Sequence, residues 1–315
     1  MSHKVIITCA VTGSSLSPSM SPHLPVTPDE IVEQSMAAVS AGASILHLHA
    51  RRPEDGYPTN DPSVWRQFVP RLRDGTDAII NMSASLGSGA EQRLEAVLEL
   101  RPDIATVIVG SMNYGLFYKA ENQGISQFDQ EWEREAFGPA SRRIITQNSF
   151  ETIAEMIDLL TEHEIAMEFE CYDVGHLYIL KHHLSQRSLP KPIILQFLTG
   201  ILGGIASDPE HIVHLKRTAE QLFGPDLMLF THGTGMANIR TASLGALMGT
   251  HLRVGQEDNL FESPGVPFLS NAAQVEKIVR ILREFGMEPA TPAEARQMLQ
   301  LSSPAASEGK GISPG

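Results

Sequence analysis

Two histidines, His47 and His49, have the residue type and spacing most suggestive of chemistry in this sequence. They belong to residues 45–51, Ile-Leu-His-Leu-His-Ala-Arg, which the apolar pattern predicts to be a buried strand. Alternate residues of a strand point to the same side, so both imidazoles project from one face. Two neutral imidazoles form half of a site for a metal such as Zn²⁺, and catalysis needs a third ligand and an open position. The alternative is that both histidines only bond to neighbours at a strand end.

Residues 251–259, His-Leu-Arg-Val-Gly-Gln-Glu-Asp-Asn, contain the second candidate group. Glu257 could complete a His₂Glu metal site, and Asp258 beside it would be a carboxylate near the open position. Arg253 offers a forked donor for a substrate carboxylate. The competing interpretation is a solvated acidic loop that caps the next helix.

Apolar strand-like runs alternate with periodic helix-like segments along the chain. A helix is expected after Thr27, with Pro28 at its first position and Gly42 at its end. Further helix starts are expected at Ser149 and within 207–210. Eight strands are expected, at 5–11, 44–50, 78–83, 104–110, 165–171, 192–198, 226–231 and 250–254.

Eight apolar strands, each followed by a helix, predict an α/β fold with a parallel sheet buried on both faces. We therefore expect a closed (β/α)₈ TIM barrel, a single catalytic domain over 1–301, with an insertion after strand four at 111–148 near the barrel mouth. Residues 302–315 are small, polar and rich in Gly and Pro, and are expected to form a disordered tail. The runner-up is an open doubly wound sheet, but no Gly-x-Gly-x-x-Gly follows the first strand. The motif at 233–235, Gly-Thr-Gly, fits a tight turn or a phosphate cradle equally.

In barrel enzymes the catalytic groups lie at the carboxyl ends of the strands. In this sequence polar residues are concentrated at the predicted carboxyl ends of the strands. Polar residues with only structural roles would be scattered along the chain. Besides the two histidines and the 253–258 group, they are Ser83, Thr106, Glu168, Glu170 and His232.

Composition narrows the class of partner. The chain has 315 residues and a net charge of −13, which argues against a nucleic-acid partner but permits an anionic small ligand in a positive pocket. Its two cysteines, Cys9 and Cys171, are expected to be buried and reduced, as in the cytoplasm. Neither a signal peptide nor a bilayer-spanning stretch is recognisable, so no membrane partner is expected.

The sequence resembles the β-keto acid cleavage enzyme family, typified by 3-keto-5-aminohexanoate cleavage enzyme, over nearly its whole length. The most specific segments are His-Leu-His-Ala-Arg at 47–51 and Arg-Val-Gly-Gln-Glu-Asp-Asn at 253–259. Segments 202–205, Leu-Gly-Gly-Ile, and 110–114, Gly-Ser-Met-Asn-Tyr, are also typical.

The resemblance implies a barrel enzyme with a divalent metal, usually zinc, that converts a β-keto acid and acetyl-CoA into acetoacetate and a new acyl-CoA. It implies a homo-oligomer, a dimer or tetramer. It also implies that Arg253 neutralises the substrate carboxylate or positions Asp258, which acts as general base. The implied metal ligands are His47, His49 and Glu257; the residues that hold or activate substrate are Ser83, Thr106, Arg253 and Asp258, with Glu168 as a further acid of the pocket.

Three positions depart from the family pattern. Ser15 stands where amine-cleaving members carry an acid, so we expect a substrate without an amine. The usual Ser-Thr-Gly-Gly stretch reads Ser-Ala-Ser-Leu-Gly at 83–87, which should reshape the mouth. His232 occupies a position where a small residue is common, and is either a substrate contact or a satisfied histidine.

Two other functions compete. A metal-dependent aldolase or a hydrolase on a TIM barrel would work without CoA; the amidohydrolase arrangement is disfavoured because it places His-x-His on strand one. A binding or scaffold protein on a decayed barrel predicts that ligands are lost, yet His47, His49 and Glu257 are all present.

Overall fold

The computed structural model describes residues 3–301, and the tail predicted at 302–315 lies outside them. Eight parallel strands close into a barrel, because the strand that starts near the N-terminus pairs with the last barrel strand. This confirms the predicted (β/α)₈ fold and excludes the open sheet. The barrel strands are β2 (Ile7–Ala10), β3 (Ile45–Leu48), β6 (Ile79–Ser83), β7 (Ile104–Ile108), β10 (Ala166–Cys171), β11 (Ile193–Thr199), β12 (Leu227–Gly233) and β13 (His251–Val254).

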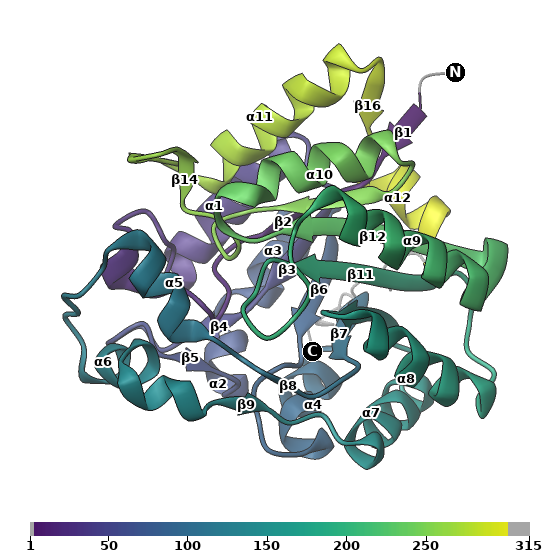
Figure 1. The fold of residues 1–315 in the computed structure, drawn as a ribbon, viewed down its shortest axis with the longest axis horizontal. Helices are drawn as coiled ribbons and strands as arrows, with labels where there is room; N and C mark the ends of the chain where they lie inside the picture. Colours follow the sequence, from purple (N-terminus) through teal and green to yellow (C-terminus); the bar gives the residue numbers. More distant parts are fainter. Residues whose placement is uncertain (1–2, 302–315) are drawn as a thin grey trace, which may run out of the picture.

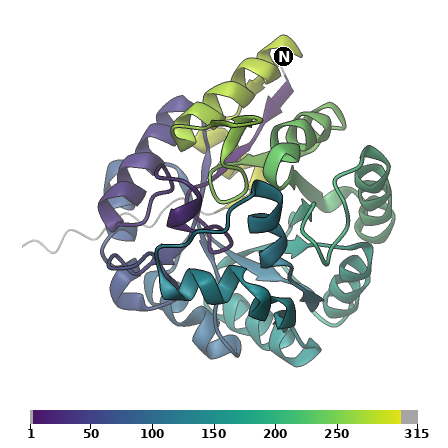
Figure 2. The same ribbon diagram turned by 60° about the vertical axis from the view of Figure 1, so that its left-hand side comes forward.

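Helices surround the strands on the outside (Figures 1 and 2). They are α1 (Pro28–Ala41), α2 (Pro62–Trp65), α3 (Val69–Gly75), α4 (Ala90–Leu100), α5 (Leu116–Gln123), α6 (Glu131–Phe137), α7 (Phe150–Glu162), α8 (Val174–Ser185), α9 (Pro209–Phe223), α10 (Asn238–Leu247), α11 (Asn271–Glu284) and α12 (Pro292–Leu299). Short 3-10 helices are η1 (Pro18–Met20), η2 (Pro139–Arg143), η3 (Gly224–Asp226) and η4 (Gly235–Ala237). Within 3–301, no helix combines the length and apolar character needed to cross a membrane.

Two predicted strands are each divided in the structure. The run at 5–11 breaks at Ile6, whose N–H donates to the ring of His251 instead of joining the barrel ladder. As a result β1 (His3–Val5) leaves the barrel and pairs with β16 (Met287–Pro289). The run at 44–50 breaks after Leu48, and β4 (Ala50–Arg51) pairs with β5 (Pro58–Thr59) outside the barrel.

Two of the three predicted helix starts have a side-chain cap; at the third, Asp208 precedes α9 but its side chain makes no capping hydrogen bond. Thr27 accepts from the backbone N–H of Glu30, whose side chain accepts from the N–H of Thr27, so the two form a capping box. Gly42 ends α1 with a φ of 121°. Ser149 caps α7 by accepting from Thr152. These local interactions fix where each helix starts relative to the strand before it.

The barrel interior is apolar at its base and polar above. Inward residues such as Ile45, Ile79 and Ile104 form a buried base, against which α12 packs through Ala295 and Leu299. Two residues further along the strands the inward positions become polar. They include Thr8, His47, Asn81, Thr106, Glu168, Gln196 and Arg253, and all are buried.

The insertion at 111–148 lies at the barrel mouth, as predicted. It contains β8 (Met112–Asn113), α5, α6, η2 and β9 (Ile145–Thr146). Ala120 of α5 and Phe137 of α6 pack with Leu16, in the loop after β2, and with Leu260, which follows β13. Leu260 is followed directly by a small antiparallel hairpin, formed by β14 (Phe261–Ser263) and β15 (Val266–Pro267). The insertion therefore covers loops from both ends of the sequence.

Candidate active site

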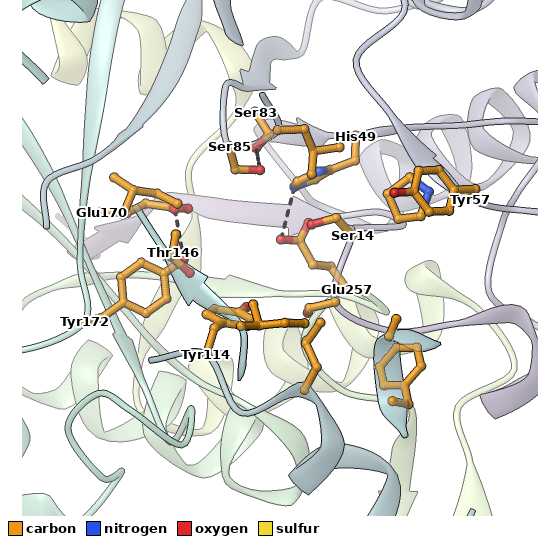
Figure 3. Close-up of a pocket in the computed structure, with 18 of the residues that line it drawn as sticks. Ser14, His49, Tyr57, Ser83, Ser85, Tyr114, Thr146, Glu170, Tyr172 and Glu257 are labelled. Carbon is orange, nitrogen blue, oxygen red and sulfur yellow. Dashed lines mark hydrogen bonds and ion pairs between the residues drawn. The ribbon is translucent and has the colours of Figure 1, made fainter. Parts of the chain in front are cut away.

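His47, His49 and Glu257 converge at the carboxyl end of the barrel, although Glu257 is more than 200 residues from the histidines. The Nε2 atoms of the two histidines are 3.3 Å apart. Glu257 Oε2 lies 3.5 Å from His47 Nε2, and Glu257 Oε1 lies 3.4 Å from His49 Nε2. Figure 3 shows His49 and Glu257 facing one another in the pocket. The three predicted ligands thus form one cluster.

This cluster has the dimensions of a metal site. Bonds of about 2.0–2.1 Å in tetrahedral geometry place neighbouring ligand atoms about 3.3–3.4 Å apart. The two histidine Nε2 atoms match this separation at 3.3 Å, and each lies within 3.5 Å of a different oxygen of the Glu257 carboxylate. Glu257 Oε2 is buried and has no hydrogen-bond partner within the described residues. Two imidazoles and one carboxylate are a donor set suited to Zn²⁺ and related divalent cations.

The charge states of the cluster also suit a cation. Burial lowers the pKa of His47 to about 4, so its imidazole is neutral at pH 7. Burial opposes ionisation of Glu257, but Arg253 and the two histidines outweigh that effect and hold its pKa well below the usual range. Neutral imidazole and ionised carboxylate are the forms that bind metal.

Arg253 organises the carboxylates behind the cluster. Its Nε and Nη2 donate to the two oxygens of Asp258, at 2.8 and 2.9 Å. Nη2 also donates to Glu257 Oε1 at 2.6 Å, and Nη1 donates to Gln196 at 3.1 Å and Glu170 at 3.4 Å. All three nitrogens therefore have protein partners. Of the two roles expected for this arginine, the geometry favours positioning Asp258 over grasping a substrate carboxylate.

A buried polar chain lies beneath the cluster of His47, His49 and Glu257. Thr106 Oγ1 is 3.4 Å from His47 Nδ1 and donates to Asn81 Oδ1 at 2.9 Å. Asn81 in turn donates to Glu168 Oε1 at 2.9 Å. Thr106 and Glu168 thus support the ligands from within the barrel, and neither lines the cavity. Such contacts to the second ring nitrogen orient a metal-binding histidine.

A cavity of about 410 Å³ opens in front of the cluster, a size typical of small-molecule sites. Of the predicted site residues, His49, Glu257, Ser83 and Ser15 line it. The loop after β2 supplies Ser15, and β6 ends in Ser83, whose hydroxyl bonds to Ser85 at 3.0 Å. The insertion closes the cavity with Tyr114, Leu116, Trp132, Phe137 and Ile144.

His232 lies behind the cavity against Asp258. Its Nδ1 is 3.7 Å from Asp258 Oδ2 and 3.2 Å from the carbonyl of Gly233. Burial lowers its pKa to about 4, so the ring is neutral. Since it does not line the cavity, this position favours a supporting contact to Asp258 over contact with a substrate.

Two further residues of the site do not follow from the resemblance. Glu170 lines the cavity, and its Oε2 accepts from the hydroxyl of Tyr172 at 3.2 Å. Burial raises the pKa of Glu170 to about 8, against the opposing effect of Arg253. The sequence indicated Glu170, because alternate residues of a strand share a face and Glu170 lies two positions after Glu168.

The second residue is Lys119 of α5, which donates to Ser15 at 2.6 Å. Nothing in the sequence indicated it.

Comparison with known proteins agrees with this geometry. The family model described as beta-keto acid cleavage enzyme matches residues 4–301. The chain is 42% identical to the 3,5-dioxohexanoate:acetyl-CoA acetone transferase of Paraburkholderia graminis, over 95% of this chain and 96% of that protein. It is 31% identical to the 3-keto-5-aminohexanoate cleavage enzyme of Acetoanaerobium sticklandii, over 95% and 99% of the two chains.

Among solved structures, the chain resembles ObcA in a ternary complex with a C4-CoA adduct and oxalate. The TM-score is 0.72 at 17% sequence identity, and the match covers 89% of this chain and 68% of ObcA. At this identity the likeness supports the fold alone.

Proposed function

Because this chain belongs to the beta-keto acid cleavage enzyme family, we propose that it converts a β-keto acid without an amine, and acetyl-CoA, into acetoacetate and a new acyl-CoA. The chain is an acetyl-CoA-dependent transferase that cleaves keto acids. The finer proposal concerns the substrate and the residues. It is supported chiefly by the 42% identity to a transferase named for 3,5-dioxohexanoate, together with Ser15 in place of the expected acid.

The reaction exchanges one carbon–carbon bond for another. The bond between C2 and the keto carbon of the acid breaks, and C2 becomes bonded to the acetyl carbon of acetyl-CoA. The CoA sulfur leaves the acetyl group and takes up the acyl group that is released. With 3,5-dioxohexanoate the products would be acetoacetate and acetoacetyl-CoA, so the atoms balance without an oxidant or reductant.

We propose His47, His49 and Glu257 as ligands of a divalent cation, with zinc as the first candidate, because their separations and buried donor atoms fit one. When bound, such a cation polarises the carboxylate and ketone oxygens of a β-keto acid. Thr106 orients the ring of His47 through its 3.4 Å contact to Nδ1. Arg253 holds Glu257 in its ionised form.

Asp258 is the proposed general base for the proton on C2; it lies outside the cavity lining, so its carboxylate would have to turn from Arg253 toward the substrate. Arg253 fixes both oxygens of its carboxylate, which follows Glu257 directly in the chain. Ser83, at the cavity wall, now donates to Ser85 Oγ; with its O–H turned to the substrate, it is the proposed hydroxyl donor to oxygen atoms on which negative charge develops. The apolar side chains of the insertion reduce access of water to the cavity.

The test is acetoacetate production from acetyl-CoA by zinc-loaded protein with neutral, acidic and cationic β-keto acids. Acetoacetate from a neutral keto acid, lost in Glu257→Ala and kept in the matched control Glu262→Ala, is the expected result. Turnover of 3-keto-5-aminohexanoate as fast as any neutral acid would contradict the proposed substrate class. Cleavage without acetyl-CoA would indicate an aldolase or hydrolase.

We also propose a cytoplasmic homo-oligomer, a dimer or tetramer. Cys9 and Cys171 are both buried free thiols, which supports a reducing compartment. The oligomeric state is proposed from family resemblance and is measured directly by light scattering coupled to size-exclusion chromatography.

A further inference from the structure

The cavity wall contains a contact between two segments that are distant in sequence. Lys119, on α5 of the insertion, reaches Ser15 in the loop after β2, and its Nζ lies 2.6 Å from Ser15 Oγ. Ser15 lines the cavity beside Glu257, whereas Lys119 lies behind it and is half-buried. This contact couples the lid formed by the insertion to the wall of the site.

Among the side chains that the structure describes, which exclude those of residues 122 and 123, Lys119 donates only to the Ser15 hydroxyl and forms no ion pair. Asp258 and Glu257 attract it from further away, but both already bind Arg253. Burial lowers the pKa of Lys119 to about 8, which leaves it mainly an ammonium at pH 7. An ammonium in this position repels a cationic ligand and favours an electron-rich one.

The direction of the hydrogen bond between Lys119 and Ser15 also favours a ligand that accepts a hydrogen bond. An ammonium can only donate, so Ser15 Oγ accepts from Lys119 and keeps its own proton to donate. Tyr114 lines the same cavity. Because Ser15 also lines the cavity, an acceptor on a bound ligand can take the proton that Ser15 retains.

We propose that Lys119 and Ser15 form a specificity subsite in which the Ser15 hydroxyl donates a hydrogen bond to a carbonyl oxygen on the keto acid, beyond its reacting ketone. This inference rests on the proposed function and names the residues that would read the substrate's far end. A 5-oxo group satisfies the subsite. A 5-methylene group leaves the half-buried Ser15 donor without a partner, and a 5-ammonium group meets a like charge.

The test compares 3,5-dioxohexanoate with 3-oxohexanoate, which has the same length and lacks the 5-oxo oxygen. We expect the wild type to prefer the dioxo acid roughly 5- to 100-fold in kcat/KM, the range for leaving a hydrogen-bond donor of the site without its acceptor. Lys119→Met and Ser15→Ala should each bring this ratio close to one, and the double variant should add little. Lys119→Arg should retain most of the preference. Lys181→Met, on the outer helix α8, is the matched control and should keep the wild-type ratio.

A second readout is independent of turnover. Calorimetric titration of each keto acid into zinc-loaded protein without acetyl-CoA should show the same preference and the same loss in Lys119→Met. The two proposals can fail separately. If neither the wild type nor any variant makes acetoacetate, the proposed function fails. The subsite still stands in that case if the wild type binds the dioxo acid more tightly and Lys119→Met loses this preference. The subsite is overturned if folded Lys119→Met and Ser15→Ala keep the wild-type ratio, whether kcat/KM is unchanged or falls equally with both acids.

Discussion

The backbone of Gly13 lies against the side chain of Glu257. A Cβ atom at position 13 would lie 2.2 Å from Glu257 Cγ. Gly13 also has a φ of 64°, a backbone conformation that residues with a side chain rarely adopt. The close approach leaves room for Glu257 to extend toward His47 and His49. The identity of residue 13 therefore bears directly on the proposed metal site.

Gly13→Ala should displace Glu257 and weaken zinc binding, because both the clash and the positive φ act at one position. The measurement is zinc retained after dialysis against a competing chelator, with folding checked by circular dichroism. Gly175→Ala is the matched control, since a Cβ there has no neighbour within 4 Å. Full zinc retention by folded Gly13→Ala would show that Glu257 is not held in this position.

Thr106→Val should lower zinc affinity without unfolding the barrel. Valine keeps the shape of the side chain but cannot bond to His47 Nδ1 or to Asn81. Loss of such an outer contact reduces metal affinity about 10- to 100-fold, and competition with a chromogenic chelator measures it. Thr218→Val, which removes a buried hydroxyl from α9, should leave affinity unchanged; an equal fall in both variants would argue against a specific role.

Arg253→Met should destabilise the metal-free protein by about 3–5 kcal/mol, the usual effect of removing one partner of a buried ion pair. The side chain is fully buried, and its loss leaves Asp258 and Glu257 without their cation. Urea unfolding in the presence of a chelator measures the change. The exposed pair of Arg283 and Glu288 provides the control, because Arg283→Met should cost within about 0.5 kcal/mol. A similar small cost at Arg253 would contradict the proposed network.

His251→Gln should reduce the sensitivity of stability to acid. Burial lowers the pKa of His251 to about 4 from an ordinary 6.5, so the unfolded chain takes up this proton first as pH falls. Stability is therefore lost as pH falls from about 6.5 to about 4. Between pH 7 and pH 5 the wild type should lose about 2 kcal/mol more than His251→Gln.

Urea unfolding at the two pH values tests this difference, and the contributions of other histidines cancel in the comparison. Glutamine retains an acceptor for the N–H of Ile6, which His251 now binds at 3.1 Å. A wild-type slope in His251→Gln would mean that His251 titrates normally in the fold.

The sequence alone determined the class of fold and the metal-ligand candidates. Eight apolar runs with intervening capped helices predicted the barrel, and the period of two placed His47 and His49 on one face. Both features are local: a strand alternates its faces, and a helix cap involves residues three apart. The breaks at Ile6 and after Leu48 escaped prediction because they depend on partners elsewhere, such as the His251 ring.

The tertiary structure alone decided which polar groups meet. Barrel closure sets the register of β13 against β2, and so brings Arg253 and Glu257 to the histidines. It turned Arg253 toward Asp258 instead of the cavity, placed Thr106 and Glu168 beneath the ligands, and brought Lys119 to Ser15. Local periodicity specifies which face a side chain takes, but the partner across the barrel depends on packing between distant segments. His47 and Thr106 are 59 residues apart, and Ser15 and Lys119 are 104 apart.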